Sequence, residues 1–185
     1  MIMVRPSLYT DELIHHYLGN GCWEETTIRD LCRQNARECG DKEAVVDGRT
    51  RLSWSEVEEY SNRLALAFLE LGFNRDDVLL VQLYNCVELF LLLVACEKAG
   101  VIIAGCPPTF RQAEIEAIAR HTGAVGIVVA KERHGFDYSK MVQDIRPNLP
   151  QLKHVLVTDN NVPGEMISFW EMIRHSGKLT PEHLK

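Results

Sequence analysis

Residues 78–108 constrain the fold more than any other stretch of this chain. They open with an uninterrupted apolar run at 78–81, rich in Val and Leu, which is typical of a strand covered on both faces. Residues 87–99 are too many for a typical strand and contain good helix formers, and Gly100 follows them where a helix C′ glycine belongs. A second apolar run follows at 101–104. This order predicts a βαβ unit of about thirty residues with a buried helix.

Polar residues followed three positions later by an acidic residue or glutamine indicate where helices begin, as in a capping box. Apolar residues at helical spacing follow each of these pairs, as Val57, Tyr60 and Leu64 follow Ser53 and Glu56. For Asn85, contact with a ligand is the alternative to capping. The four predicted pairs are Thr27 with Asp30, Ser53 with Glu56, Asn85 with Glu88, and Thr109 with Gln112.

Short apolar runs predict the remaining strands. Residues 44–46 and 51–53 flank the turn-forming pair Asp47 and Gly48, which indicates an antiparallel hairpin. Residues 125–130 and 153–158 are two further buried-type strands, and a loop at 131–137 separates the first of them from a helix at 138–145. Strands that alternate with helices in this way predict an α/β fold with a mainly parallel sheet flanked by helices and joined by right-handed crossovers.

The expected organisation has three parts. Residues 1–26 form an N-terminal arm with a short helix that begins at Thr10, and residues 27–175 form the α/β unit. Residues 168–173 add one or two helical turns near its end. Residues 176–185 are polar and are expected to form a linker.

Composition excludes several classes of protein. The chain is 46% hydrophobic and 25% charged, which argues against disorder, and its net charge of −6 argues against a nucleic-acid surface. The most apolar segment contains Glu88 and is too short to span a bilayer, so no membrane partner is expected. The N-terminus has no apolar h-region, and a cytoplasmic location is therefore the expectation.

Cysteine and histidine give no metal site. None of the six cysteines forms a C-x-x-C pair, which leaves zinc and thioredoxin-like sites unsupported. Cys86, Cys96 and Cys106 lie in the most apolar region and are expected to be buried, reduced thiols. His15 and His16 are adjacent, so they do not share a helix face and are expected to be solvated. No metal ligand is predicted.

Parallel α/β folds bind their ligands beyond the carboxyl ends of the strands, so the segments after each strand are the places to inspect. None of them contains a G-x-G-x-x-G, a G-x-x-x-x-G-K-S/T or a G-x-S-x-G pattern, which disfavours a dinucleotide-binding enzyme and a serine hydrolase. The four segments are Tyr84 with Asn85, residues 105–109, Ala130 with Lys131, and Thr158 with Asp159.

Three lone residues remain as candidates. Cys106 follows a strand and could be a nucleophile, but spacing identifies no histidine or acidic partner, so packing is the preferred interpretation. Arg111 lies near a helix start and could bind an anion, although a solvated role is favoured because arginine is mostly exposed. Asp137, with Tyr138 after it, is expected to cap the helix that follows.

Several stretches together resemble the adenylate-forming enzymes, the superfamily of AMP-dependent synthetases that includes acyl-CoA synthetases. Residues 52–57, Leu-Ser-Trp-Ser-Glu-Val, look like the family's first core motif, and residues 97–107 look like the second, with Lys98, Ala99 and Gly100 at its turn. The 2,3-dihydroxybenzoate-AMP ligases are the most similar branch. That likeness is carried by residues 20–23, 81–83, 111–115, 135–138 and 149–153.

Two positions depart from the pattern. Tyr84 stands where the family usually has proline, and residues 108–110 stand where the aryl-acid branch has Ser-His. The second departure weakens the aryl-acid assignment relative to a general acyl-CoA synthetase, and an aryl acid remains the expected substrate.

The resemblance implies a partial N-terminal subdomain of the family fold. The full-length family joins a carboxylic acid to ATP with Mg²⁺ and transfers the acyl group to coenzyme A or a carrier protein. The reaction needs a Ser/Thr/Gly-rich phosphate loop with lysine, a ribose-binding Asp and a lysine on a mobile domain, and none of these motifs occurs in this sequence. We therefore assign no catalytic, cofactor-binding or metal-binding residue. The expectation is an inactive fragment that lacks its downstream part, and the alternative is a non-catalytic binding module.

Overall fold

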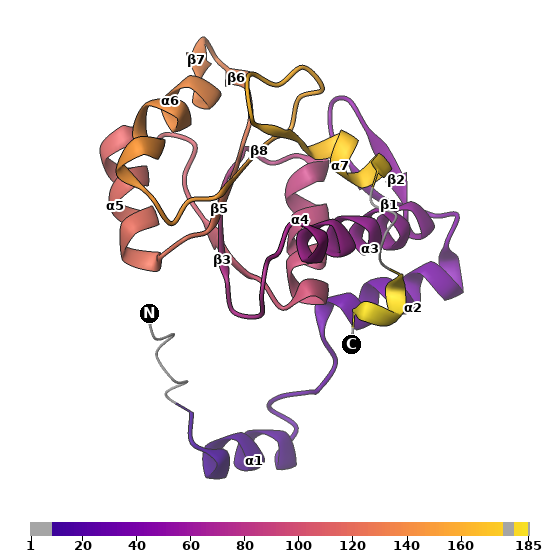
Figure 1. The fold of residues 1–185 in the computed structure, drawn as a ribbon. Coiled ribbons are helices and arrows are strands. Elements are labelled where there is room, and N and C mark those ends of the chain that lie inside the picture. Colours follow the sequence, from indigo (N-terminus) through magenta and orange to yellow (C-terminus); the bar gives the residue numbers. More distant parts are fainter. Residues whose placement is uncertain (1–8, 176–179, 185) are drawn as a thin grey trace.

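A computed structural model describes residues 9–175 and 180–184 (Figure 1). Its centre is a five-stranded sheet in which every neighbouring pair is parallel, which confirms the predicted α/β fold. In the strand Val78–Gln82, second from one edge of the sheet, Leu80 is in register with Ala104 on one side and Ile127 on the other. The strand order is β4 (Ile102–Gly105), β3 (Val78–Gln82), β5 (Gly126–Val129), β8 (His154–Val157) and β9 (Ile167–Ser168).

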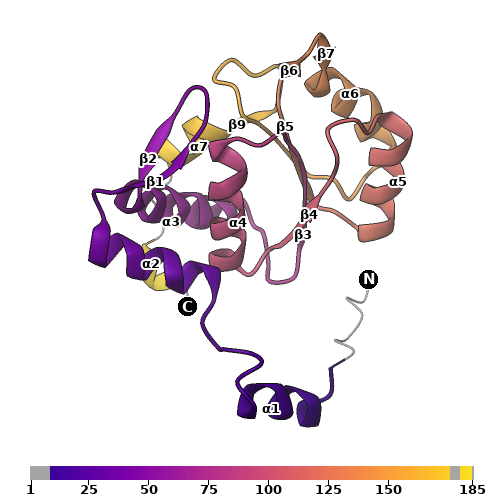
Figure 2. The same ribbon diagram turned by 180° about the vertical axis from the view of Figure 1, so that it is seen from behind.

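Helices cover both faces of this sheet (Figures 1 and 2). One face carries α4 (Val87–Ala99), with α3 (Trp54–Glu70), α2 (Ile28–Cys39) and α7 (Phe169–His175) around it. The other face carries α5 (Gln112–Thr122) and α6 (Tyr138–Ile145). The chain thus leaves β3 toward one face and leaves β5 toward the other, so the topology reverses between these two neighbouring strands.

The two faces produce two hydrophobic clusters. Leu79 and Val81 belong to the cluster under α3 and α4, whereas Leu80 belongs to the cluster under α5 and α6. This alternation follows from the strand period of two, which turns successive side chains to opposite faces. It explains why β3 reads as a continuous apolar run and not as an alternating one.

A buried lysine joins α3 to α4. Lys98 has a side chain that is only 1% exposed, and its Nζ forms an ion pair with Glu58 at 2.7 Å. The same Nζ donates to Ser61 Oγ and Asn62 Oδ1, each at 2.8 Å. Glu58 is also approached by Arg33 at 3.7 Å. Lysine is almost never fully buried unless it is paired, and this network supplies the pairing.

The hairpin of β1 (Glu43–Val46) and β2 (Arg51–Ser53) is antiparallel, as predicted. Its loop is residues 47–50, which is longer than a two-residue turn. Asp47 orders the loop, because its Oδ1 accepts the backbone N–H groups of Arg49 and Thr50, both at 2.8 Å. Its Oδ2 accepts the backbone N–H of Val87 at 2.9 Å, which ties the hairpin to the start of α4.

Of the four predicted capping pairs, two are confirmed and two are wrong. Thr27 with Asp30 and Ser53 with Glu56 form capping boxes. Asn85 does not cap α4: the N-cap position is Cys86, which makes no side-chain cap bond, and Asp47 supplies the acceptor from the hairpin.

Thr109 does not cap α5 either. The backbone N–H of Phe110 donates to the carbonyl of Pro107 at 3.0 Å, so residues 107–110 close a turn and the helix begins only after Arg111. The Arg111 N–H donates to the carboxylate of Glu114 at 3.0 Å.

Several short elements were not predicted from the sequence. The predicted loop at 131–137 contains a hairpin of β6 (Glu132–Arg133) and β7 (Phe136–Asp137), whose turn holds His134 and Gly135 at positive φ. The predicted helix at 138–145 is confirmed, with Asp137 as its cap. The strand β9 and the 3₁₀ helices η1 (Arg146–Asn148) and η2 (Pro181–His183) were also not predicted.

The helix predicted in the N-terminal arm is present as α1 (Asp11–Gly19), with Thr10 as its cap. It lies away from the other helices in both ribbon views, and none of its residues is buried (Figures 1 and 2). The first eight residues of the arm and residues 176–179 and 185 of the expected linker lie outside the described part. The division into 1–26, 27–175 and 176–185 stays a prediction. Within residues 9–175 and 180–184, no helix has the length and apolarity needed to cross a membrane.

Candidate functional site

A cavity of about 330 Å³ opens at the carboxyl ends of β3 and β5, where the topology reverses. Ligands of open parallel α/β sheets bind in the crevice at this kind of switch point. The cavity lies between segments that are distant in the sequence. Its lining comes from the hairpin loop 47–50, the segment after β3 (Leu83, Tyr84, Asn85, Cys86) with Glu88, the segment after β5 (Ala130, Glu132, Arg133), and Thr158 with Asp159 after β8.

Part of this lining was predicted from the sequence. Of the four strand-end segments, three contribute: both Tyr84 and Asn85, Ala130 without Lys131, and both Thr158 and Asp159. Residues 105–109 do not line the cavity. Arg133 and the hairpin loop were not predicted to line a site, because no local pattern indicates that residues 47–50 lie above a strand end.

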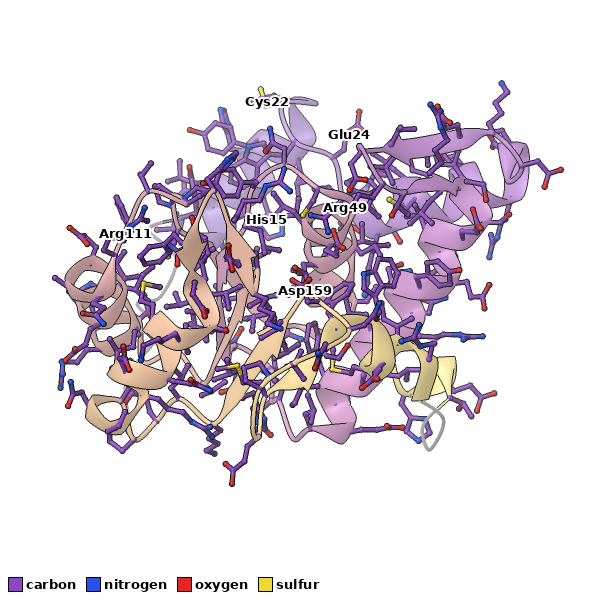
Figure 3. All side chains as sticks on the ribbon, turned by 90° about the horizontal axis from the view of Figure 1, so that it is seen from above. His15, Cys22, Glu24, Arg49, Arg111 and Asp159 are labelled. Atoms are coloured by element: carbon purple, nitrogen blue, oxygen red, sulfur yellow. The ribbon has the colours of Figure 1, made fainter. Side chains whose placement is uncertain are left out.

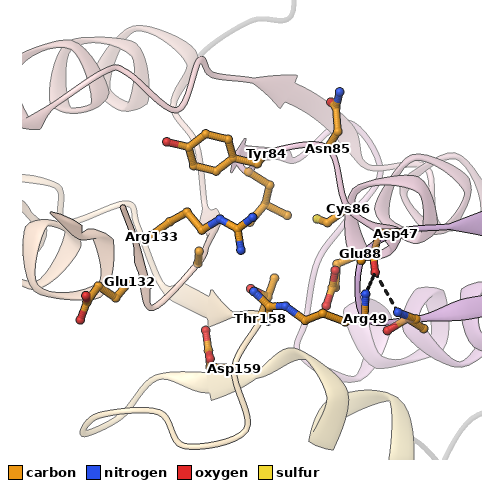
Figure 4. A pocket seen from close by; sticks show the side chains of 14 residues that line it. Asp47, Arg49, Tyr84, Asn85, Cys86, Glu88, Glu132, Arg133, Thr158 and Asp159 are labelled. Atoms are coloured by element: carbon orange, nitrogen blue, oxygen red, sulfur yellow. Dashed lines mark hydrogen bonds between the residues drawn. The ribbon is translucent and has the colours of Figure 1, made fainter. Parts of the chain in front are cut away.

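Asp47 fixes the hairpin wall of the cavity. Partial burial acts to raise the pKa of its carboxyl, but hydrogen bonds from the N–H groups of Val87, Arg49 and Thr50 outweigh burial and hold that pKa below its usual range. The carboxylate lies at the N-terminus of α4, where the helix dipole also favours negative charge. The loop that carries Arg49 is therefore held against α4 by an ionised side chain (Figure 4).

Two further carboxylates of the cavity have donors from the protein. The indole Nε1 of Trp170 donates to Glu88 Oε1 at 3.0 Å. The backbone N–H of Lys131 donates to Asp159 Oδ2 at 3.1 Å. These bonds fix the loop after β5 to the segment after β8 and fix α7 to the start of α4.

Arg111, unlike the arginines that line the cavity, forms hydrogen bonds to described residues through its guanidinium. The Nη1 atom of Arg111 donates to the carbonyls of Pro108 and Phe110, both at 2.9 Å, and its guanidinium lies 4.0 Å from the centre of the Phe136 ring. Arg111 is exposed, as expected, but it is engaged in holding a loop and is not simply solvated. It lies apart from Arg49 and Asp159 and outside the cavity (Figure 3).

The loop after β4 is held by two further side chains. Gln82, which is 1% exposed, donates from Nε2 to the carbonyls of Pro107 at 3.1 Å and Phe110 at 2.9 Å. The Tyr138 hydroxyl donates to the carbonyl of Pro108 at 2.9 Å. This loop is consequently rigid scaffold beside the cavity.

The cysteines behave mostly as expected. Cys106 is buried among the apolar residues under α5 and α6, and burial raises the pKa of its thiol. Burial also raises the pKa of Cys96 and of Cys86 to about 12, although Cys86 is only half-buried. High thiol pKa values make poor nucleophiles, which supports the packing interpretation of Cys106. In the described part of the chain, no group of three or more His, Cys, Asp or Glu side chains could hold a metal ion.

Comparison with known proteins places this geometry in context. The family described as AMP-binding enzyme matches residues 32–183. A 2,3-dihydroxybenzoate-AMP ligase of Bacillus subtilis is 33% identical over 149 residues, which cover 80% of this chain and 28% of that protein. The salicyl-AMP ligase / salicyl-S-ArCP synthetase of Mycobacterium tuberculosis is 32% identical over 170 residues, which cover 89% of this chain and 30% of that protein.

Two solved structures are also similar to this chain. The apo structure of MbtA from Mycobacterium smegmatis is 27% identical, with a TM-score of 0.80 over 95% of this chain and 33% of that one. The anthranilate CoA ligase AuaEII in complex with anthranoyl-AMP is 22% identical and shares the fold, with a TM-score of 0.75 over 82% of this chain and 28% of that one. The chain therefore spans no more than a third of the length of the relatives it matches here.

Proposed function

Because the chain belongs to the AMP-binding enzyme family, we propose that it forms the N-terminal part of a ligase that activates an aryl carboxylic acid. The whole enzyme would use ATP to make an acyl-adenylate and would then transfer the acyl group to a thiol. The observation that carries this proposal is the 33% identity to a 2,3-dihydroxybenzoate-AMP ligase over 80% of the chain. The family resemblance found in residues 52–57 and 97–107 is confirmed by the same match.

We assign a scaffold role to this part of the enzyme. The sequence contains no Ser/Thr/Gly-rich phosphate loop, and the described residues contain no group of acidic side chains that fits Mg²⁺. Asp47, Glu88 and Asp159 accept hydrogen bonds from protein donors. The proposal therefore places ATP, Mg²⁺ and the catalytic groups in a downstream part, which is the principal partner of this chain. Coenzyme A or a carrier protein is the proposed thiol acceptor, and the cytoplasm, which supplies ATP and coenzyme A, is the proposed location.

The first experiment measures ATP–pyrophosphate exchange by purified 1–185 with 2,3-dihydroxybenzoate and with salicylate. We expect no exchange above a protein-free blank, because the sequence contains no Ser/Thr/Gly-rich phosphate loop to hold the reacting phosphates. Exchange that depends on both the protein and the acid would overturn the scaffold assignment.

The second experiment asks whether this scaffold supports the reaction. In the Bacillus subtilis ligase, the matched 149-residue segment is replaced by the corresponding segment of this chain. We expect acid-dependent exchange by the chimera, and none by a control from which that segment is deleted. A chimera that folds cooperatively but activates no aryl or alkyl carboxylic acid would contradict the proposal.

The alternative is a non-catalytic binding module on the same fold. This alternative is supported by two clusters of buried hydrophobic residues within the described part of the chain, one on each side of the sheet. Light scattering and thermal unfolding of 1–185 separate the two ideas. A monomer with a cooperative transition favours an autonomous module, whereas aggregation through open strand edges favours a part cut from a larger enzyme.

A further inference from the structure

Two arginine side chains of the switch-point cavity form no ion pair within the described part of the chain. Arg49 comes from the β1–β2 loop and Arg133 from β6, and Figure 4 shows both side chains extending into the cavity. Neither guanidinium forms an ion pair or a hydrogen bond with another described residue, although four carboxylates line the same cavity. The guanidinium of Arg133 has only a ring contact, 5.8 Å from the centre of Tyr84. Both guanidinium groups are thus available to an anion.

The acidic residues offset these charges only in part, because Arg49 helps to lower the pKa of Asp47 but neither guanidinium pairs with a carboxylate of a described residue. Asp47, Glu88 and Asp159 each accept hydrogen bonds from the backbone or indole donors described above. Glu132 is directed away from the middle of the cavity (Figure 4). The positive groups that extend into the open space are therefore the two guanidiniums.

The surroundings favour a phosphate group. A guanidinium presents a planar fork of donors that matches phosphate oxygens in pairs. The hydroxyl of Thr158 lines the same cavity and is a neutral donor. The volume of about 330 Å³ lies within the roughly 300–1,000 Å³ of small-molecule sites. Asp47 fixes the backbone around Arg49, so this guanidinium starts from a defined position.

We propose that Arg49 and Arg133 form a phosphate-binding site for a small phosphorylated molecule in the cavity between the ends of β3 and β5. The site goes beyond the proposed function, in which a downstream loop holds the phosphates that react. Two sources carry this chemistry: the polyphosphate of a nucleotide, and the phosphate monoester of a pantetheine thiol.

The experiment titrates purified 1–185 with sodium pyrophosphate by calorimetry, at constant ionic strength set with chloride. We expect saturable binding that Arg49→Gln and Arg133→Gln each weaken by about tenfold or more, because each removes a charge-assisted contact. Arg51→Gln is the matched control, since Arg51 belongs to the same hairpin but pairs with Glu43 outside the cavity. Thermal unfolding without ligand checks that the three variants remain folded.

The outcomes are distinct. Absence of saturable binding at matched ionic strength would overturn the proposal, as would an equal loss of affinity in Arg51→Gln, which would indicate only general attraction of anions. A parallel titration with 4′-phosphopantetheine identifies the source: tighter binding than pyrophosphate indicates the thiol cofactor, and weaker binding indicates a nucleotide. Because the titration uses 1–185 alone, failure of the ligase proposal leaves its result unchanged.

Discussion

Replacement of Lys98 by methionine tests the network that joins α3 to α4. The substitution keeps an unbranched side chain but removes an ammonium with three hydrogen bonds to Glu58, Ser61 and Asn62. Removing one partner of a buried ion pair costs about 3–5 kcal/mol. Glu58 is 19% exposed and keeps its contacts with Arg33 and Asn62, so we expect the lower end, about 3 kcal/mol. Burial lowers the pKa of Lys98 against the opposing effect of Glu58, and relief of that burial cost also limits the loss.

Urea unfolding of 1–185 measures this change, and thermal unfolding should show a decrease in Tm of roughly 6–12 °C. The double variant Glu58→Gln/Lys98→Met should lose less than the sum of the single variants by at least about 1 kcal/mol, because the two residues contact each other. Lys140→Met is the control, since Lys140 is 68% exposed and its pair with Asp144 should contribute no more than about 0.5 kcal/mol. A loss below about 1 kcal/mol in Lys98→Met, or strict additivity, would refute the reasoning.

Three further experiments test other parts of the fold. Asp47→Ala should destabilise the chain by about 1–2 kcal/mol in urea unfolding at neutral pH, because the N–H of Val87 loses its acceptor. The folded pKa of Asp47 lies below 3.8, so the difference from wild type should persist above that pH and disappear as pH falls through the lower folded value. A difference that grows on acidification would contradict the assignment. Gly126→Ala should cost about 1–3 kcal/mol, since a Cβ would lie 2.8 Å from Phe73 Cζ, whereas Gly48→Ala meets nothing within 4 Å and should be near neutral. In thiol labelling of the native chain, exposed Cys22 should react first and Cys96, with a pKa of about 12, only on unfolding; equal rates would show that α4 is not buried.

Sequence reasoning succeeded where structure is determined locally. The alternation of apolar runs and helical segments gave the parallel sheet, and the pairs Thr27 with Asp30 and Ser53 with Glu56 gave two helix starts, because a capping box involves only neighbouring residues. It failed where a distant residue replaced the local one. Asn85 had the right type and spacing for a cap, but the carboxylate of Asp47, forty residues before Val87, occupies that role.

The candidate site likewise has a part that could be predicted from the sequence and a part that could not. The ends of β3, β5 and β8 could be placed at one edge of the sheet from topology alone, and Tyr84 and Thr158 do line one cavity. Arg49 could not be placed there, since the hairpin that carries it belongs to a separate two-stranded sheet. Arg133 lies in strands of two residues, which are too short to give a periodic signal, although the positive φ of Gly135 shows that the glycine marked their turn.

The bond between Asp47 and Val87 also bears on the order in which the protein assembles. The two residues are separated by forty positions, so during synthesis the hairpin emerges well before the helix whose first turn it holds. Its strands can pair at once, because they are adjacent in sequence. The polar loop, however, reaches its final position only when α4 has formed, and the lining after β5 and β8 is synthesised later still. Vectorial synthesis therefore produces the side of the cavity that carries Arg49 before the side that carries Arg133.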